Sequence, residues 1–204
     1  MIAIVDYGVG NIRAFIDIYK GLNLPVIAAK TAEELKGADR IVLPGVGAFD
    51  WAMDRLMRSG MRETLDEMVL ERDVPVLGVC VGMQLMANGS EEGELPGLGW
   101  IDGNVKLFDE STFSHKTHLP HMGWNDLTSF DASGVFKFLN SPRFYFLHSY
   151  YFSPINEDNV LATTHYGTSF ASAVGRKNII GTQFHPEKSH SWGITLLSNF
   201  AREF

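Results

Sequence analysis

The stretch with the clearest chemical content centres on Cys80, the one cysteine of the chain. Gly78 and Gly82 flank it in a Gly-x-Cys-x-Gly pattern, between an apolar run that predicts a strand and a segment that predicts a helix. This spacing matches the nucleophile elbow usually seen with serine, in which a sharp turn holds the nucleophile and small neighbours allow close packing. A helix N-terminus favours thiolate over thiol, and the N–H of Val81 is placed to donate to an oxyanion. The pattern predicts a nucleophilic cysteine.

A lone cysteine is also commonly buried as a small hydrophobe, so this prediction needs a second group. His185 and Glu187 stand two apart at the end of an apolar run, with Pro186 between them. In an extended chain that spacing puts both side chains on one face. A carboxylate bound to one imidazole nitrogen fixes the tautomer, and the other nitrogen can take the cysteine proton. Cys80, His185 and Glu187 are therefore the candidate catalytic residues, and the alternative is a structural histidine beside a core cysteine.

The elements that must position these residues alternate through the first half of the chain. Apolar runs predict strands, and amphipathic stretches between them predict helices. The predicted strands are Ile2–Val5, Val26–Ala29, Arg40–Leu43 and Val74–Val79, and the predicted helices are Asn11–Lys20, Trp51–Arg58, Met61–Leu70 and Gly82–Ala87. Strands joined by helical crossovers indicate a mainly parallel sheet covered on both faces. Cys80 then lies at the carboxyl edge of the sheet, where open α/β sheets bind ligands.

The second half of the chain has a different pattern. Its predicted β segments are Trp100–Phe108, Arg143–Phe152, Asn159–Thr164, Ser169–Val174 and Ile179–Gln183, and one helix is predicted over Trp192–Phe204. We expect an α/β three-layer sandwich whose mainly parallel central sheet is extended by antiparallel strands. At 204 residues, length favours a single domain over residues 1–204.

Composition narrows the classes of partner. Apolar residues make up 45% and charged residues 20%, which is ordinary globular usage. The formal net charge of −7 disfavours nucleic acid or an anionic membrane surface as the main partner, since both need a dense cationic footprint. The start of the chain lacks the pattern of a secretory signal, and no apolar run is long enough to span a membrane. With a single cysteine and no internal disulfide, a cytoplasmic location is expected.

Three histidines, His115, His118 and His121, follow one another at intervals of three and suggest a metal site. Pro120 and the Ser/Thr-rich setting argue against a regular helix that would bring them together. Because neither a cysteine nor a carboxylate cluster completes the set, no metal is expected.

The N-terminal Gly8-Val-Gly10 superficially resembles a phosphate-binding loop. Arg13 occupies the place of the third fingerprint glycine, and Ala29-Lys30 stands where an acid would end the second strand. Dinucleotide binding is therefore disfavoured, and no cofactor is expected.

At this point the residues are similar to a known family. Gly78–Gln84 and Gln183–Ser189 resemble the two signatures of class I (triad) glutamine amidotransferases. More narrowly, the chain resembles the HisH family, the glutaminase subunits of imidazole glycerol phosphate synthase, nearly end to end. The further shared segments are Asp6–Asn11, Leu43–Phe49, Pro120–Asn125 and Phe144–Tyr150. The resemblance implies hydrolysis of L-glutamine to glutamate and ammonia, and a heterodimer with a HisF-like cyclase that receives the ammonia.

The resemblance also assigns roles around the triad. Backbone N–H groups near Val46 and Gly47 would complete the oxyanion site with Val81. The alternative interpretation of this segment is an ordinary strand-to-helix turn. Gly47, Gln84, Ser149 and Tyr150 would contact the substrate, although Gln84 alone would otherwise pass for a surface glutamine. The residues expected at the partner interface and ammonia gate are Asn11, Pro120, Met122, Trp124, Tyr145 and Lys188.

Other functions stay open on the sequence. His190–Gly193 and Leu95–Trp100 depart from the commonest pattern and are similar to a subgroup that serves sugar amidation in surface-polysaccharide pathways. The same glutaminase chemistry would then feed a different synthase. A cysteine hydrolase of the elbow type and a catalytically silent interaction domain are the remaining alternatives.

Overall fold

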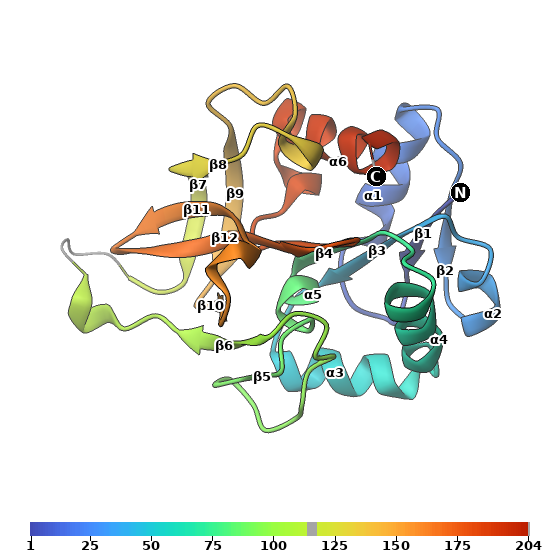
Figure 1. Cartoon of the computed structure of the whole chain (residues 1–204), viewed down its shortest axis with the longest axis horizontal. Helices are drawn as coiled ribbons and strands as arrows, with labels where there is room; N and C mark the ends of the chain where they lie inside the picture. The colour runs from blue at the N-terminus through green and yellow to red at the C-terminus, as the bar shows by residue number, and fades with distance from the viewer. Residues whose placement is uncertain (114–117, 204) are drawn as a thin grey trace.

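The computed structural model describes residues 1–113 and 118–203. Within these residues an eight-stranded central sheet has the order β2-β1-β3-β4-β13-β12-β11-β8 (Figure 1). The first five strands in this order pair in parallel, and the last three pair antiparallel. Its strands are β1 (Ile2–Val5), β2 (Val26–Ala29), β3 (Arg40–Gly45), β4 (Val76–Cys80), β8 (Ser129–Phe130), β11 (Val160–Tyr166), β12 (Thr168–Arg176) and β13 (Ile179–Thr182). The predicted sheet type is confirmed.

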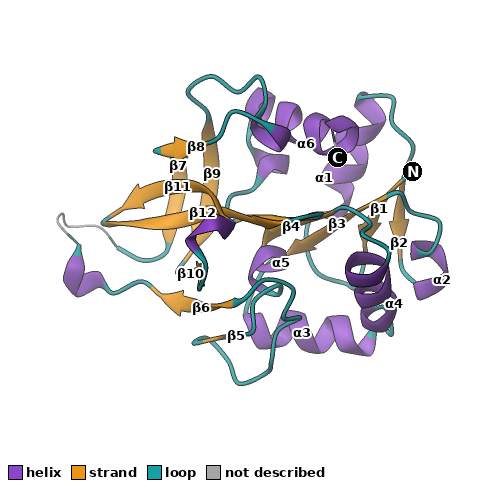
Figure 2. Cartoon of the chain, viewed as in Figure 1, coloured by secondary structure: helices purple, strands orange, loops and turns teal. Residues whose placement is uncertain are grey.

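Helices cover both faces of this sheet (Figure 2). They are α1 (Ile12–Gly21), α2 (Ala32–Leu35), α3 (Phe49–Arg58), α4 (Arg62–Asp66), α5 (Val81–Gln84) and α6 (His190–Glu203). Helices α1 and α6 lie on one face, and α3, α4 and α5 lie on the other (Figure 1). The three-layer arrangement is therefore confirmed. The segment predicted as a helix over Met61–Leu70 continues from α4 into a π-helical turn, η1 (Glu67–Glu71).

Two smaller sheets stand beside the central one and carry the rest of the second half. One contains β5 (Gly89–Ser90), β6 (Gly103–Leu107) and β10 (Tyr150–Pro154), and the other pairs β7 (His121–Asp126) with β9 (Arg143–His148). Short 3₁₀ turns complete the described chain: η2 (Glu110–Thr112), η3 (Gly134–Phe136), η4 (Glu157–Asn159) and η5 (Pro186–Lys188).

The single β segment predicted over Arg143–Phe152 is wrong. The chain forms two strands that separate at Ser149 and join different sheets, β9 with β7 and β10 with β6. Strand β7 was not predicted either. Its Gly123 has a φ of +126°, a backbone conformation that glycine tolerates and that side-chain alternation does not indicate.

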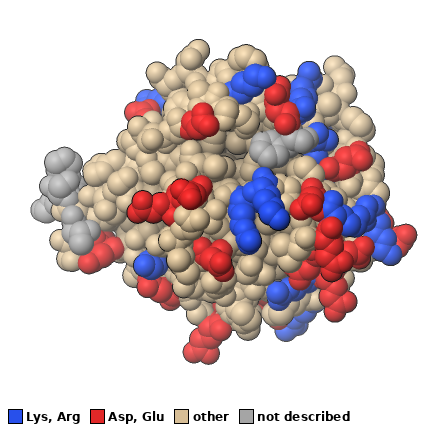
Figure 3. Space-filling view, viewed as in Figure 1, with Lys and Arg blue, Asp and Glu red and all other residues tan. Residues whose placement is uncertain are grey.

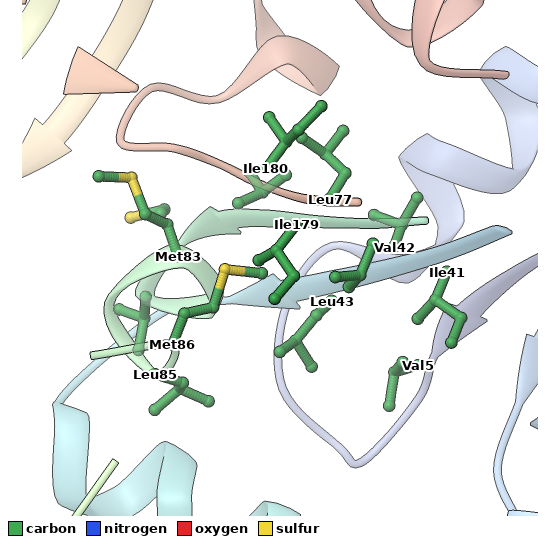
Figure 4. Close-up of a cluster of buried hydrophobic side chains, with 14 of the residues drawn as sticks. Val5, Ile41, Val42, Leu43, Leu77, Met83, Leu85, Met86, Ile179 and Ile180 are labelled. Carbon is green, nitrogen blue, oxygen red and sulfur yellow. The ribbon is translucent and has the colours of Figure 1, made fainter. Parts of the chain in front are cut away.

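The core lies between the sheet and its helical layers. All residues of β1 and β4 are buried, as expected for parallel strands covered on both faces. Figure 4 shows side chains from these strands, from β3 and β13, and from the segment around α5, meeting in one cluster. The buried side chains of Met83 and Met86 extend this core to the turn that holds Cys80. The nucleophile is thus supported by fully packed strands.

Helix α1 begins at a conventional cap. The Asn11 side chain accepts a hydrogen bond from the N–H of Ala14, which satisfies one of the free donors of the first turn. Phe15 and Tyr19 lie on the buried face of the helix, and Lys20 stands in its last turn.

On the face drawn in Figure 3, the basic side chains lie among acidic ones. No helix in the described ranges, 1–113 and 118–203, is long and apolar enough to cross a membrane.

Candidate functional site

Cys80 is the last residue of β4 and stands immediately before α5. Its φ of 56° and ψ of −114° lie outside the common regions for a residue with a side chain, so the turn is strained. A Cβ on Gly82 would lie 1.9 Å from the carbonyl oxygen of Leu43, and one on Gly78 would lie 2.6 Å from Cε of Met86. The two glycines therefore let α5 pack against β3 and β4. The geometry is that of a nucleophile elbow.

Helix α5 is shorter than the predicted Gly82–Ala87, because it ends at Gln84. Four residues align few peptide dipoles, so the helix can stabilise a thiolate only weakly.

His185 and Glu187 form the buried pair that their spacing predicted. Nδ1 of His185 lies 2.8 Å from Oε1 of Glu187, and both side chains are at most 3% exposed. Because the carboxylate accepts from Nδ1, the Nε2 side of the ring is left for the hydrogen bond with Cys80. The backbone of His185 is tied to β9 by its N–H, which donates to the carbonyl of Tyr145 at 2.9 Å. His185 thus lies between Cys80 and Glu187.

The pKa of His185 is raised above its ordinary value of 6.5. Burial is the largest influence and acts in the opposite direction, since it disfavours the charged ring. Hydrogen bonds to Cys80 and Glu187, and the negative charges of those two groups, together outweigh burial. The site therefore favours the imidazolium form of His185.

Gln84 and Gln183 form a buried amide pair beneath the nucleophile. Nε2 of Gln84 donates to the carbonyl of Tyr150 at 3.0 Å and to Oε1 of Gln183 at 3.1 Å. Nε2 of Gln183 lies 3.8 Å from Sγ of Cys80. Gln84 is 3% exposed, so the reading of it as a surface glutamine is wrong. Gln183 was not predicted, although it precedes His185 by two residues, a spacing that places side chains on one face of an extended chain.

Cys80 opens into a cavity of about 340 Å³, within the range of small-molecule sites. Most of the predicted residues line it, namely Val46, Gly47, Val81, Gln84, Pro120, Ser149, Tyr150, His185 and Lys188. Glu92, Leu147 and His148 line it too and were not predicted. Oε2 of Glu92 accepts from the N–H of Phe49 at 2.9 Å, which fixes a carboxylate at the wall. The loop that carries Glu92 has no periodicity or motif from which its position could be inferred.

His148 belongs to a second hydrogen-bonded chain beside the cavity. Its Nδ1 lies 2.8 Å from the carbonyl of Tyr150, and its Nε2 lies 2.9 Å from Nδ1 of His121. Nε2 of His121 lies 3.1 Å from Nδ2 of Asn125. Burial lowers the pKa of His121 to about 4 and, with the nearby His121, that of His148 to about 3. Both rings are neutral near pH 7.

The histidines that suggested a metal site do not form one group in the described residues. His115 lies outside those residues, and the carbonyl of His118 accepts from the hydroxyl of Tyr166. His121 is paired with His148 instead. In the part of the chain that the structure describes, no set of three or more metal-binding side chains comes together.

The residues expected to face a partner fall into three places. Met122 and Trp124 are 64% and 39% exposed on β7, and the ring of Trp124 stacks on His190. Nζ of Lys188 lies 5.7 Å from the ring centre of Tyr145, close to the cavity that Lys188 and Pro120 line. Asn11 stands apart from the cavity as the cap of α1. An exposed apolar and aromatic surface thus adjoins the cavity.

Comparisons with known proteins identify the family of the chain. The family model described as glutamine amidotransferase class-I matches residues 3–204. The chain is 56% identical over 202 residues to "Imidazole glycerol phosphate synthase subunit HisH" of Bdellovibrio bacteriovorus, covering 98% of this chain and 99% of that protein. It is 49% identical to the protein of the same name from Leptospira borgpetersenii, with the same coverage.

Solved structures share the fold. A structure described as a glutamine amidotransferase superposes with a TM-score of 0.74 at 20% identity, covering 98% of both chains. PurLQS from Thermotoga maritima superposes with a TM-score of 0.72 at 16% identity, covering 99% of this chain and 97% of that one. At such low identity these likenesses concern the fold alone.

Proposed function

The chain belongs to the class I glutamine amidotransferases and, within them, to the HisH family, and from this premise we propose that it is the glutaminase subunit of an imidazole glycerol phosphate synthase. It hydrolyses L-glutamine to glutamate and ammonia for histidine biosynthesis. The hydrolysis belongs to this chain, and any lyase step of the synthase belongs to its partner. The observation that carries the proposal is the buried His185–Glu187 pair beside Cys80, with Cys80 and His185 both lining the cavity.

Acylation begins with attack of the Cys80 thiolate on the carboxamide carbon of glutamine, which forms a C–S bond and an oxyanion. The His185 imidazolium then gives its Nε2 proton to the departing nitrogen, the C–N bond breaks, and ammonia leaves a thioester. His185 next takes a proton from water as the water attacks the thioester. Expulsion of the thiolate yields glutamate and restores the ion pair. Glu187 holds the ring and stabilises its positive charge throughout.

The oxyanion is assigned to backbone donors on either side of Cys80. Val81 begins α5, where N–H groups have no partner inside the helix, and Gly47 lines the same cavity with a φ of +83°. Val46 stands beside it at the mouth and is 37% exposed. Loss of one such donor typically costs about 3 kcal/mol of transition-state stabilisation.

Substrate recognition is assigned to other residues that line the cavity. Glu92 presents a carboxylate of the right charge for the α-ammonium group of glutamine. Both N–H groups of the Gln84 amide already have acceptors, so its oxygen is left to receive a donor from the substrate. The backbone at Ser149 and Tyr150 completes the contacts.

The ammonia is assigned to a HisF-like cyclase bound as a heterodimer. Free ammonia is mostly protonated near neutral pH and would be lost to solvent, so a docked acceptor keeps it reactive. The surface around Met122 and Trp124 is exposed, apolar and next to the cavity, which fits a partner rather than solvent. On this proposal Lys188 and Tyr145 guard the passage, with Nζ of Lys188 5.7 Å from the ring centre of Tyr145, and Asn11, the cap of α1, belongs to the same interface.

A labelling experiment tests the chemistry. A glutamine analogue that alkylates thiols should modify Cys80 stoichiometrically in the assembled complex, and Cys80→Ala should abolish both labelling and glutamate release. Absence of labelling would support a silent interaction domain instead. Faster turnover of peptides than of glutamine would favour the alternative of an elbow-type hydrolase.

Co-purification from the native cell tests the partner. We expect a cyclase of the histidine pathway, low glutaminase activity in the isolated chain, and stimulation by the loaded partner. Equal glutaminase turnover with and without that partner would contradict the proposed coupling between the subunits. A sugar-amidating synthase in the complex would identify a different acceptor for the ammonia. On the same proposal, residues 1–204 act as one domain in the cytoplasm.

A further inference from the structure

Gln183 is a fully buried polar side chain that the mechanism above does not use. Its exposed fraction is 0%, and it stands between β13 and His185. Its backbone N–H donates to the carbonyl of Ser172 at 2.9 Å, which ties this residue to β12. A buried amide is costly unless its donors and acceptor find partners. Its partners are therefore informative.

The orientation of the Gln183 amide follows from one backbone carbonyl. The oxygen of Tyr150 can only accept, so the Gln84 atom 3.0 Å away must be the NH₂ group. The second N–H of that group faces Gln183 at 3.1 Å, and the facing atom of Gln183 must then be its oxygen. The NH₂ group of Gln183 is thereby turned toward Sγ of Cys80, at 3.8 Å.

The Tyr150 carbonyl is itself held in place. It accepts a second hydrogen bond from Nδ1 of His148, and Nε2 of the same ring is hydrogen-bonded to Nδ1 of His121. Because a carbonyl oxygen has two lone pairs, these two donors satisfy it. If the Gln84 amide were rotated by half a turn, its oxygen would face the carbonyl oxygen of Tyr150. If the Gln183 amide were rotated, its NH₂ group would face the NH₂ group of Gln84. The direction of the donor at the sulfur is therefore determined.

We propose that Gln183 is a further catalytic residue, which donates a side-chain N–H to the Cys80 thiolate and stabilises it. The bond is stronger to a charged sulfur than to a neutral thiol, so it favours the nucleophilic form. It also serves the second half of the reaction, in which the thiolate is expelled from the tetrahedral intermediate. The inference deepens the proposed function and rests on it, because Cys80 must react as a thiolate.

The groups around the sulfur leave a place for such a donor. His185 supplies the cationic donor, but it must give its proton to the departing nitrogen and cannot hold the sulfur at every step. Tyr7 interacts with the charge of Cys80, but burial raises its pKa and its hydroxyl donates to the carbonyl of Pro44 at 2.7 Å. The carbonyl of Leu147, 3.9 Å from Sγ, can only accept. Gln183 is the neutral donor among these neighbours.

The test is the pH dependence of alkylation of Cys80 by iodoacetamide in the full chain. Cys80 is the sole cysteine, so its modification is followed without ambiguity. Gln183→Met keeps the length of the side chain and removes the donor. It should move the acidic inflection of the alkylation rate up by about one pH unit, a tenfold loss of thiolate on that limb. Gln183→Glu should move the inflection further, because a carboxylate would face the sulfur.

Ser172→Ala is the matched control. It lies on the neighbouring strand, and its buried hydroxyl has no hydrogen-bond partner in the described residues. It should leave the inflection unchanged. An inflection in Gln183→Met that coincides with that of the unmodified chain would overturn the proposal, whatever the variant does to thermal stability.

A measurement on the unmodified protein covers the case in which both Gln183 variants fail to fold. The side-chain amide resonance of Gln183 should shift as Cys80 ionises, and that shift should vanish in Cys80→Ala. A Gln183 amide resonance that does not shift when Cys80 ionises would overturn the proposal. Neither measurement needs glutamine or the synthase. If Gln183→Met shifts the alkylation inflection as expected but the unmodified protein shows no glutaminase activity, only the proposed function is refuted. If the unmodified protein is an active glutaminase but Gln183→Met leaves the inflection unchanged, only the role of Gln183 is refuted.

Discussion

Glu187→Gln isolates the charge that holds His185. The substitution keeps the shape of the side chain but replaces the carboxylate that accepts from Nδ1 at 2.8 Å. Both side chains are at most 3% exposed, so solvent screens this interaction little. A hydrogen bond to a charged group contributes about 1.5 to 3 kcal/mol. At 1.36 kcal/mol per pKa unit, the pKa of His185 should fall by about one to two units.

The assay is the pH profile of glutamate release in the complex. Loss of about 1.5 to 3 kcal/mol of transition-state stabilisation lowers kcat/KM by about 10- to 150-fold. The sign of the pH shift is also determined. Glu187 and Cys80 raise the pKa of His185 above 6.5, so the imidazolium persists to higher pH in the unmodified enzyme. The alkaline limb should therefore move to lower pH in the variant. An unchanged profile with an unchanged kcat/KM would refute the role given to Glu187.

Two predictions concern stability and are read from denaturant unfolding. Gly82→Ala places a Cβ 1.9 Å from the carbonyl oxygen of Leu43 and should cost more than about 3 kcal/mol, whereas Gly21→Ala, with no atom within 4 Å, should cost nothing; equal stabilities would contradict the packing argument. Burial lowers the pKa of His121 to about 4 and that of His148 to about 3. Below pH 6.5 both histidines are therefore protonated in the unfolded chain while they remain neutral in the folded chain. Stability present above pH 6.5 should fall by up to about 1.4 kcal/mol per histidine for each unit toward pH 4, and a flat profile would show that the rings are not buried neutral.

The fold was predictable where periodicity and length agree. Ile2–Val5 and Val26–Ala29 are strands with the predicted bounds, because buried parallel strands are continuous apolar runs. The antiparallel region was less predictable. A run of aromatic residues hid the break at Ser149, since both strands that it separates are apolar and extended. Strand β7 was not predicted from the sequence because its register depends on pairing with β9.

The sequence by itself determined the elbow and the His185–Glu187 pair, because each depends on a few neighbouring residues. Glycines on both sides of Cys80 are a local requirement of a sharp turn, and a spacing of two puts His185 and Glu187 on one face. Only the tertiary structure decided what surrounds them. Glu92 reaches the cavity from a loop without periodicity, and the donor at the sulfur comes from Gln183, oriented by a carbonyl elsewhere in the chain. Contacts between residues far apart in sequence depend on packing, and local spacing carries no record of them.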